Sequence, residues 1–264
     1  MTAAEEWKHW TEARTASVSA PHGPLALTGT HWLEPEPARI TGLPGLWSAA
    51  DGLVRVSATA ADGIRLETPG HDPQDGLLDG EHTLRPDTDP VPQPATLGDV
   101  RLVPIEREGE LALRVFDPAS PARTAFAGIT VYPYAPEWAV PAVFTPFEDD
   151  RAVVVPNADG RERPLEVTGR IAFRLAGEDH TLTVSRSGER LTGVIADATS
   201  GHQTYRFRFI TLPAPGTHGR TVLDLNHAYL PPCAFADHFV CPFPPPGNRL
   251  TVAVEAGEKQ VLSR

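Results

Sequence analysis

The residues best suited to chemistry gather near the C-terminal end of the sequence. An aspartate, a histidine and a tyrosine stand within six positions there, and a cysteine follows four positions later. An imidazole beside a carboxylate and a phenol can transfer protons to and from a bound molecule. A thiol becomes a nucleophile when a histidine base, here His227 or His238, lies within hydrogen-bonding distance. The candidate catalytic residues are Asp224, His227, Tyr229 and Cys233.

Other polar residues could hold a ligand without reacting with it. An arginine inside a strand usually faces solvent, but one that points inward can clamp a carboxylate or phosphate. An asparagine can bind a polar group of a substrate, or it can anchor its own loop by satisfying nearby backbone amides. An aspartate in a polar loop can likewise cap that loop. The candidate ligand-binding residues are Asp197, Tyr205, Arg208 and Asn226.

Two histidines and both cysteines stand close enough in sequence to test for a metal site. His227, Cys233, His238 and Cys241 give the order His-x5-Cys-x4-His-x2-Cys, and zinc prefers four nitrogen or sulfur ligands. Because this spacing matches no common zinc finger or ribbon, we expect buried, reduced thiols and no metal. A disulfide across the seven intervening residues stays an alternative. Motifs for nucleotides, zinc proteases and α/β-hydrolases are missing, so we expect no cofactor.

The elements that must position these residues are strands. After residue 21, short apolar runs alternate with Gly, Pro and Asp, which is typical of an antiparallel sandwich or barrel. The clearest meander covers residues 165–212, and its last strand is Thr204–Leu212. Alternation along that strand places both phenylalanines on one face and both arginines on the other. The predicted fold class is all-β: one antiparallel β-barrel or β-sandwich domain with a short N-terminal helix and a proline-rich C-terminal loop.

Two segments depart from this strand pattern. Residues 2–18 predict one amphipathic helix with a capping box, and Trp7, Trp10 and Arg14 share a face at i, i+3 and i+7. We expect the aromatic pair to dock this helix on the β domain. Residues Gly70–Thr96, rich in Pro, Asp and Gly, predict a long surface loop with at most a short hairpin. The predicted organisation is a helix in 1–20 and a single β domain in 21–264.

Charge and composition narrow the classes of partner. The 264 residues carry a formal net charge of −11 and only two lysines, whereas nucleic-acid binders usually present a basic stripe. No stretch approaches the ~20 apolar residues of a membrane helix, and the acidic first twenty residues do not resemble a secretory signal. We therefore expect a small-molecule ligand or substrate, no nucleic acid, no membrane and a cytoplasmic location.

Several short motifs are shared with a known family. The C-terminal matches are Leu223-Asp224, Asn226, Ala228-Tyr229, Pro231–Phe235, Cys241-Pro242, Pro244-Pro245, Asn248–Leu250 and Ala256–Lys259. The upstream matches are Asp197, Thr199–Gly201, Thr204-Tyr205, Arg208-Phe209, Leu113-Arg114, Asp117 and Trp32-Leu33. Together they resemble the domain of unknown function 1684 family of bacteria and archaea, whose C-terminal pattern is roughly L-D-F-N-R-A-Y-N-P-P-C-A-F, C-P-L-P-P-x-x-N-R-L and A-G-E-K. The resemblance implies a shared fold and a shared site, but no reaction.

The sequence departs from that family pattern at a few positions. His227 stands where the family usually has arginine, Leu230 where it has asparagine, and Gly247 where glutamate is common. Phe207 replaces a glycine before Arg208. If the family binds an anion through that arginine, the changes imply an altered specificity, as in a member recruited to a specialised metabolic pathway.

Three functions of different classes remain open on this evidence. The first is a cofactor-independent enzyme that acts on a small organic molecule by acid–base or thiol chemistry, with Arg208 orienting an anion. The alternative is a non-catalytic β-barrel protein that binds a small ligand in a cavity. A third is a structural role in which the C-terminal motif only seals the barrel. Whether the protein is an enzyme, and its oligomeric state, are left open.

Overall fold

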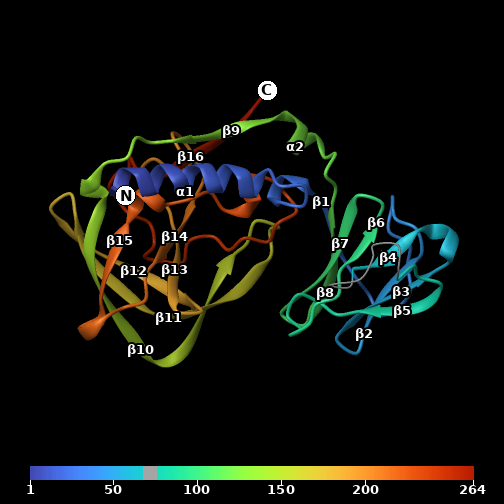
Figure 1. Cartoon of the computed structure of the whole chain (residues 1–264). Coiled ribbons are helices and arrows are strands. Elements are labelled where there is room, and N and C mark those ends of the chain that lie inside the picture. The colour runs from blue at the N-terminus through green and yellow to red at the C-terminus, as the bar shows by residue number, and fades with distance from the viewer. Residues whose placement is uncertain (68–75) are drawn as a thin grey trace. The chain divides into compact units, whose positions relative to one another are not determined.

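The computed structural model describes residues 1–67 and 76–264 (Figure 1). They form two compact units, one of Met1–Ala16 with Ala125–Arg264 and one of Ser17–Thr124. Strands make up 47% of the chain and helices 15%, which confirms the all-β prediction. The expectation of a single domain over residues 21–264 stays a prediction, because compactness does not say whether either unit folds independently.

The first unit is built on a six-stranded antiparallel sheet in the order β14-β13-β12-β11-β10-β15 (Figure 1). Its strands are β10 (Ala139–Pro156), β11 (Glu162–Leu175), β12 (Glu178–Ser187), β13 (Arg190–Ile195), β14 (Arg208–Leu212) and β15 (Arg220–Asp224). The long β10–β11 hairpin shifts register between Pro146 and Arg151. Twist and such irregularities let long strands bend, and the sheet curls into a half-barrel. The predicted meander over residues 165–212 is confirmed, although its last strand begins at Arg208 and not at Thr204.

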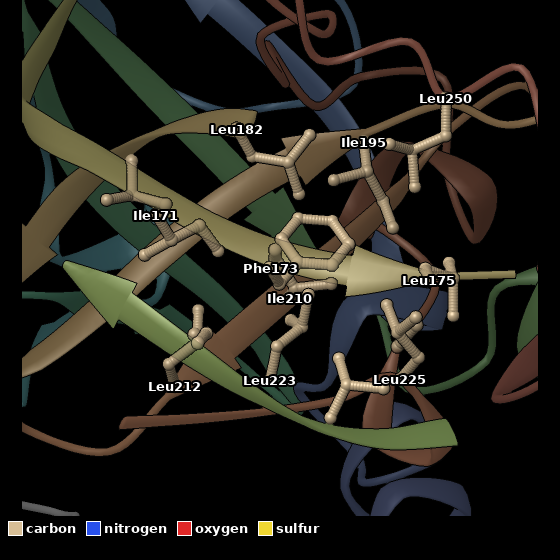
Figure 2. Close-up of a cluster of buried hydrophobic side chains, with 14 of the residues drawn as sticks. Ile171, Phe173, Leu175, Leu182, Ile195, Ile210, Leu212, Leu223, Leu225 and Leu250 are labelled. Carbon is tan, nitrogen blue, oxygen red and sulfur yellow. The ribbon is translucent and has the colours of Figure 1, made fainter. Parts of the chain in front are cut away.

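The core of this unit lies on one face of the sheet (Figure 2). Ile171 and Phe173 from β11 and Leu182 from β12 point into it, and Leu225 and Leu250 from beyond β15 join the same cluster. Burying each such side chain contributes about 1.5–3 kcal/mol, so this face dominates the stability of the unit. Because side chains alternate along a strand, every second residue of β12 faces the other way. We call this opposite side of β12–β14 the outer face.

The proline-rich segment after β15 is held to the sheet by single bridges instead of a continuous ladder. Tyr229 pairs with Phe209 of β14, and Pro242 pairs with Asn157 after β10. Proline has no N–H to donate, so a regular strand cannot form here. The segment contains two 3-10 turns, η5 (Leu225–His227) and η6 (Pro232–Ala234). It leads to β16 (Glu258–Ser263), which pairs antiparallel with β9 (Phe126–Val131).

The N-terminal helix α1 spans Ala3–Val18. Its predicted capping box is present, since the Thr2 N–H donates to Glu5 Oε2 (2.7 Å) and the Glu5 N–H donates to Thr2 Oγ1 (3.3 Å). Both bonds satisfy donors that the first turn of a helix leaves unpaired. No helix within the described ranges is long and apolar enough to cross a membrane.

The second unit combines two antiparallel sheets, ordered β1-β8-β7-β6-β4 and β2-β3-β5. Their strands are β1 (Leu27–Trp32), β2 (Leu46–Ala50), β3 (Leu53–Ala58), β4 (Ile64–Leu66), β5 (Gly80–Leu84), β6 (Ala95–Leu97), β7 (Val100–Arg107) and β8 (Glu110–Phe116). The second unit also contains the 3-10 turns η1 (Pro24–Ala26) and η2 (Ala60–Asp62). The other short helices are α2 (Pro121–Ala125), η3 (Pro136–Trp138) and η4 (Thr217–Gly219), besides η5 and η6.

The loop predicted for Gly70–Thr96 is more structured than expected. Residues 70–75 lie outside the described residues, but β5 and the start of β6 fall within the rest. β5 pairs with β3, and its Leu84 is completely buried in the core of this unit. Leu78 and Ala95 of the same stretch are buried in that core too, so composition concealed apolar residues that belong to the core.

Candidate functional site

Strand β15 ends at Asp224, and the polar residues of the C-terminal motif follow on the turn η5. Asp224 Oδ1 accepts hydrogen bonds from the Asn226 backbone N–H (3.0 Å) and from the Asn226 side-chain amide (2.9 Å). This is the capping contact that short acidic side chains make with the backbone two residues ahead. The strand does not continue to Asn226, so the two side chains meet through a turn and not along one strand face.

His227 completes the turn. Its Nδ1 lies 2.9 Å from Asp224 Oδ2, and about a third of the imidazole is exposed. The indole of Trp10 packs edge-on against the ring, with centroids 4.8 Å apart. Burial raises the pKa of Asp224, but hydrogen bonds from His227 and Asn226 outweigh burial and hold that pKa below its ordinary value. The pair has the geometry of an oriented imidazole whose second nitrogen could exchange a proton.

Asn226 is fully buried and acts as an anchor. Its side-chain oxygen accepts from the Ala135 N–H (3.1 Å), and its amide nitrogen donates to the Ala135 carbonyl (2.9 Å). Its own carbonyl accepts a bond from the Trp7 indole N–H (3.0 Å). A buried amide must satisfy its donors and acceptors inside the protein. These contacts fit the loop-anchoring interpretation of Asn226, while ligand binding by this residue stays a prediction.

The helix face that carries Trp7, Trp10 and Arg14 docks on this turn and on the segment that follows. Arg14 forms two hydrogen bonds to the carboxylate of buried Glu258, at 2.9 and 3.1 Å, and its guanidinium lies over the Tyr229 ring. Glu258 also accepts the Leu230 N–H at 2.7 Å. Paired planar contacts of this kind are geometrically specific. The predicted docking role of the aromatic pair is therefore confirmed, and Arg14 shares it.

Arg208 is fully buried, and its Nη2 lies 2.7 Å from Asp197 Oδ2. The guanidinium also donates to the backbone carbonyls of Val254 (2.9 Å), Ala256 and Glu258 (3.3 Å). A buried charge needs such a partner and such hydrogen bonds, because its desolvation is costly. Arg208 thus ties β14 to the C-terminal segment. Anion binding by Arg208 stays a prediction, and it would require one of these contacts to open.

Arg206 does not share the environment of Arg208, although strand alternation predicted one common face. β14 begins only at Arg208, so the alternation does not reach back to Arg206. The exposed Arg206 guanidinium instead lies over the rings of Tyr205 and Phe243, at 5.3 and 5.0 Å from their centroids. The prediction that both arginines occupy one face is therefore wrong.

Asp197 lies in the loop after β13 and organises it. Its Oδ1 accepts the Thr199 N–H (2.8 Å), the Thr199 hydroxyl (2.6 Å) and the Val254 N–H (3.1 Å). Burial raises the pKa of this carboxyl, but the Arg208 guanidinium and the Thr199 bonds outweigh burial and lower the pKa overall. Asp197 is therefore an ionised anchor between the loop and the C-terminal segment.

Tyr205 and the two cysteines form a separate cluster. The Tyr205 hydroxyl donates to the Cys233 carbonyl (3.0 Å) and lies 3.7 Å from its Sγ, and burial raises the pKa of Tyr205 to about 12. The Cys233 N–H donates to Cys241 Sγ (3.3 Å), and the two buried cysteines are not joined in a disulfide. A hydrogen bond with Cys241 is the main cause that lowers the pKa of Cys233, against burial. Thiol catalysis by Cys233, with His227 or His238 as the base, stays a prediction.

A cavity of about 260 Å³ lies on the outer face of β12–β14. Thr183 and Ser185 of β12 and Thr192 of β13 contribute hydroxyl groups to its wall. Thr183 and Ser185 face away from the core, since their neighbours Leu182 and Val184 belong to the core cluster, and Thr192 does so because its neighbour Leu191 belongs to the same cluster. Tyr229 and prolines of the C-terminal segment form another part of the wall. The C-terminal motif therefore contributes to this cavity through Tyr229.

The structure sorts the eight predicted site residues into separate groups. Asp224, Asn226 and His227 share the turn η5, Asp197 pairs with Arg208, and Tyr205 contacts Cys233. Tyr229 alone among the eight lines the cavity. Across residues 1–67 and 76–264, no three His, Cys, Asp or Glu side chains gather in a way that could hold a metal ion.

Sequence reasoning missed two features of the site. The first is Glu258, whose role could not be predicted because its partner Arg14 lies 244 positions away in the chain. The hydroxyl wall did leave a signal: residues 181–185 read T-L-T-V-S, an alternation of hydroxyl and apolar side chains. Such alternation predicts one buried face and one polar face.

Comparisons with known proteins agree with the resemblance of the C-terminal motifs. The model of the family described as "Protein of unknown function (DUF1684)" matches residues 124–259, which are 136 of the 264 residues. An uncharacterized protein of Haloarcula marismortui, solved by NMR, is similar with 32% identity and a TM-score of 0.43, over 51% of this chain and 77% of that one. A search of curated proteins found no match. The matched range contains all eight predicted site residues and the whole cavity wall, and the chain belongs to the DUF1684 family.

Proposed function

We propose that the protein binds a small organic molecule in the cavity on the outer face of β12–β14. One observation carries the proposal: the half-buried Thr183 and Thr192 line a cavity, and within the described part of the chain no protein group forms a hydrogen bond with either hydroxyl, which leaves both available to a ligand or to water. Most polar groups inside proteins are satisfied by protein or water, so available hydroxyls in a hollow suit a ligand. A cavity of roughly 150 Å³ can bind benzene, and this one, at about 260 Å³, has room for a larger molecule.

The polar network of the C-terminal motif supports this function indirectly. Tyr229 reaches the cavity because its backbone bridges Phe209 (2.8 and 2.9 Å) and because Arg14 covers its ring. Arg208 and Asn226 fix the segments on either side. Walls that are rigid before binding reduce the entropy lost when a ligand is held. The motif would then serve as the scaffold of a binding site.

A filled cavity tests the proposal. Val194 lines the cavity, and the larger side chain of Val194→Phe should occupy part of it. Binding of 1-octanol and of 2-phenylethanol should therefore be lost or fall at least tenfold. Saturation-transfer NMR and calorimetry would measure binding, and the melting temperature would report folding. Val154→Phe is the matched control, because Val154 is 62% exposed on β10. If no probe binds the wild type more tightly than the Val194→Phe variant, the cavity is not a binding site.

A second function, acid–base catalysis, is favoured by the 2.9 Å contact between His227 Nδ1 and Asp224 Oδ2. The part-exposed imidazole would accept a proton at Nε2, while Asp224 orients the ring. His227 does not line the cavity, so a substrate would bind beside Trp10 instead. Hydrolysis of 4-nitrophenyl butyrate by the wild type, lost in His227→Gln at an unchanged melting temperature, would support catalysis. Equal rates for the two proteins would count against it.

A further inference from the structure

The walls of the cavity differ in chemistry, and this difference bears on the class of ligand. We propose that the cavity selects an uncharged amphiphile, a molecule with an apolar body and one hydroxyl or carbonyl end. The inference rests on the proposed function of the cavity and adds which chemistry it accepts.

One wall is apolar. Val167 of β11, Val194 of β13 and Phe209 of β14 line it together with Pro242 and Pro245 of the C-terminal segment. Val194 and Phe209 are cross-strand partners, so their side chains stand side by side on the outer face. Transfer of apolar surface from water to such a wall is favourable in proportion to the area buried. The body of the ligand is therefore expected to be hydrocarbon.

The other wall carries a row of hydroxyls. Thr183 and Ser185 alternate on β12, and Ser185 is the cross-strand partner of Thr192 on β13, so the three groups lie on one face. The Ser185 hydroxyl donates to the Glu166 carbonyl and keeps lone pairs that can accept. The Thr183 and Thr192 hydroxyls can each donate and accept. This combination can bond an alcohol, which needs both roles, or a carbonyl, which needs a donor.

Fixed charge is missing from the lining. Within the described residues, the phenol of Tyr229 is the sole ionisable side chain in the cavity wall. Arg14, which covers the Tyr229 ring, is neutralised by Glu258, and Arg208 is neutralised by Asp197. Arg190, the cross-strand partner of Ser187, is exposed and lies outside the cavity wall. An ionised ligand end would lose its water without gaining a counter-charge, which costs far more than burying a hydroxyl that finds a hydrogen bond. The site should therefore reject carboxylates and ammonium ions of the same length.

Three probes of equal chain length test this selectivity. Calorimetry at pH 7 with 1-octanol, octanoate and octylammonium should show the alcohol binding at least tenfold more tightly than either ion. An ion that binds within threefold of the alcohol would overturn the inference while leaving the proposed function intact. If none of the three binds the wild type better than the Val194→Phe variant, both the inference and the proposed function fail.

A single hydroxyl deletion tests the role of the polar wall. Thr192→Val keeps the size of the side chain but removes the hydroxyl, and it should weaken 1-octanol binding about three- to tenfold while leaving toluene binding unchanged. Thr181→Val is the matched control, because Thr181 is an exposed residue of the same β12 strand outside the cavity. Unchanged 1-octanol binding in Thr192→Val, or an equal loss in Thr181→Val, would contradict the hydroxyl wall.

Discussion

Two polar regions of the first unit differ in how their groups are used. In the network that joins the C-terminal motif to β14 and to the loop after β13, the Asn226 amide and the Asp197 carboxylate are both engaged by neighbouring protein groups. On the outer face of β12 and β13, the Thr183 and Thr192 hydroxyls face a cavity without such partners in the described residues. The first pattern is what a buried structural network requires, and the second is what a binding wall offers.

This contrast shows why polar side chains in a recognisable motif need not be the residues that meet a ligand. Asp, Asn and Arg buried under a proline-rich segment must satisfy each other, because water does not reach them. Thr and Ser on a strand face carry no distinctive motif, yet they remain available for contact. The comparison predicts that substitutions in the buried polar network destabilise the protein strongly, whereas substitutions in the cavity wall destabilise it little.

The largest effect is expected from Arg208→Met. Removal of this guanidinium leaves the buried Asp197 carboxylate and the Val254 carbonyl without their partner, which should destabilise the protein by about 3–5 kcal/mol. Urea unfolding at pH 7 would measure the loss. Arg206→Met is the control, because Arg206 is exposed, covers aromatic rings in a contact of about 0.5–1 kcal/mol, and donates one hydrogen bond to the Tyr205 hydroxyl (3.0 Å). If Arg208→Met lowers the free energy of unfolding no more than Arg206→Met does, the ion pair between Arg208 and Asp197 has no structural role.

A smaller effect is expected from acid titration of Asp224. Its pKa is lowered in the folded protein, so the carboxylate stabilises the fold at pH values above about 3.9, the ordinary value. That contribution is lost as pH falls below this value toward the folded pKa. The difference in unfolding free energy between wild type and Asp224→Asn should therefore shrink between pH 5 and pH 3.

Asp179→Asn provides the matched control for that titration, because the Asp179 side chain is 86% exposed in the same unit. The difference in unfolding free energy between wild type and Asp179→Asn should stay nearly constant between pH 5 and pH 3. If Asp224→Asn behaves like Asp179→Asn, the contacts of Asp224 with His227 and Asn226 contribute nothing measurable to folding.

Much of the fold could be predicted because its signals are local. Alternation along β12 and turn residues at Gly177 and Gly188 define a hairpin meander without reference to distant parts of the chain. The capping box at Thr2 and the helix face of Trp7, Trp10 and Arg14 are also local patterns. Local spacing could therefore predict which helix face docks, but not the residues on which it docks.

The arrangement of the site could not be predicted, because it depends on contacts between distant residues. Arg14 meets Glu258 across 244 positions, and Trp7 meets Asn226 across 219. Strand alternation can assign Arg208 to a face only if the residue at which β14 begins is known. Residue propensities locate the ends of strands imprecisely. Gly257 illustrates what structure adds: its φ is +77°, and a Cβ there would clash with the Ala228 carbonyl. Glycine in that motif is thus required by packing.

The smallest effect on stability is expected from Thr192→Val, and this result would sharpen the comparison most. The hydroxyl has no partner among the described residues, so the folded state loses no hydrogen bond when the hydroxyl is replaced by a methyl group of similar size. The unfolding free energy should stay within about 0.5 kcal/mol of wild type in urea. A loss above about 1.5 kcal/mol would mean that the hydroxyl serves the fold. Unchanged stability together with weakened 1-octanol binding would show that the Thr192 hydroxyl serves binding and not folding, in contrast to the structural role expected for Arg208.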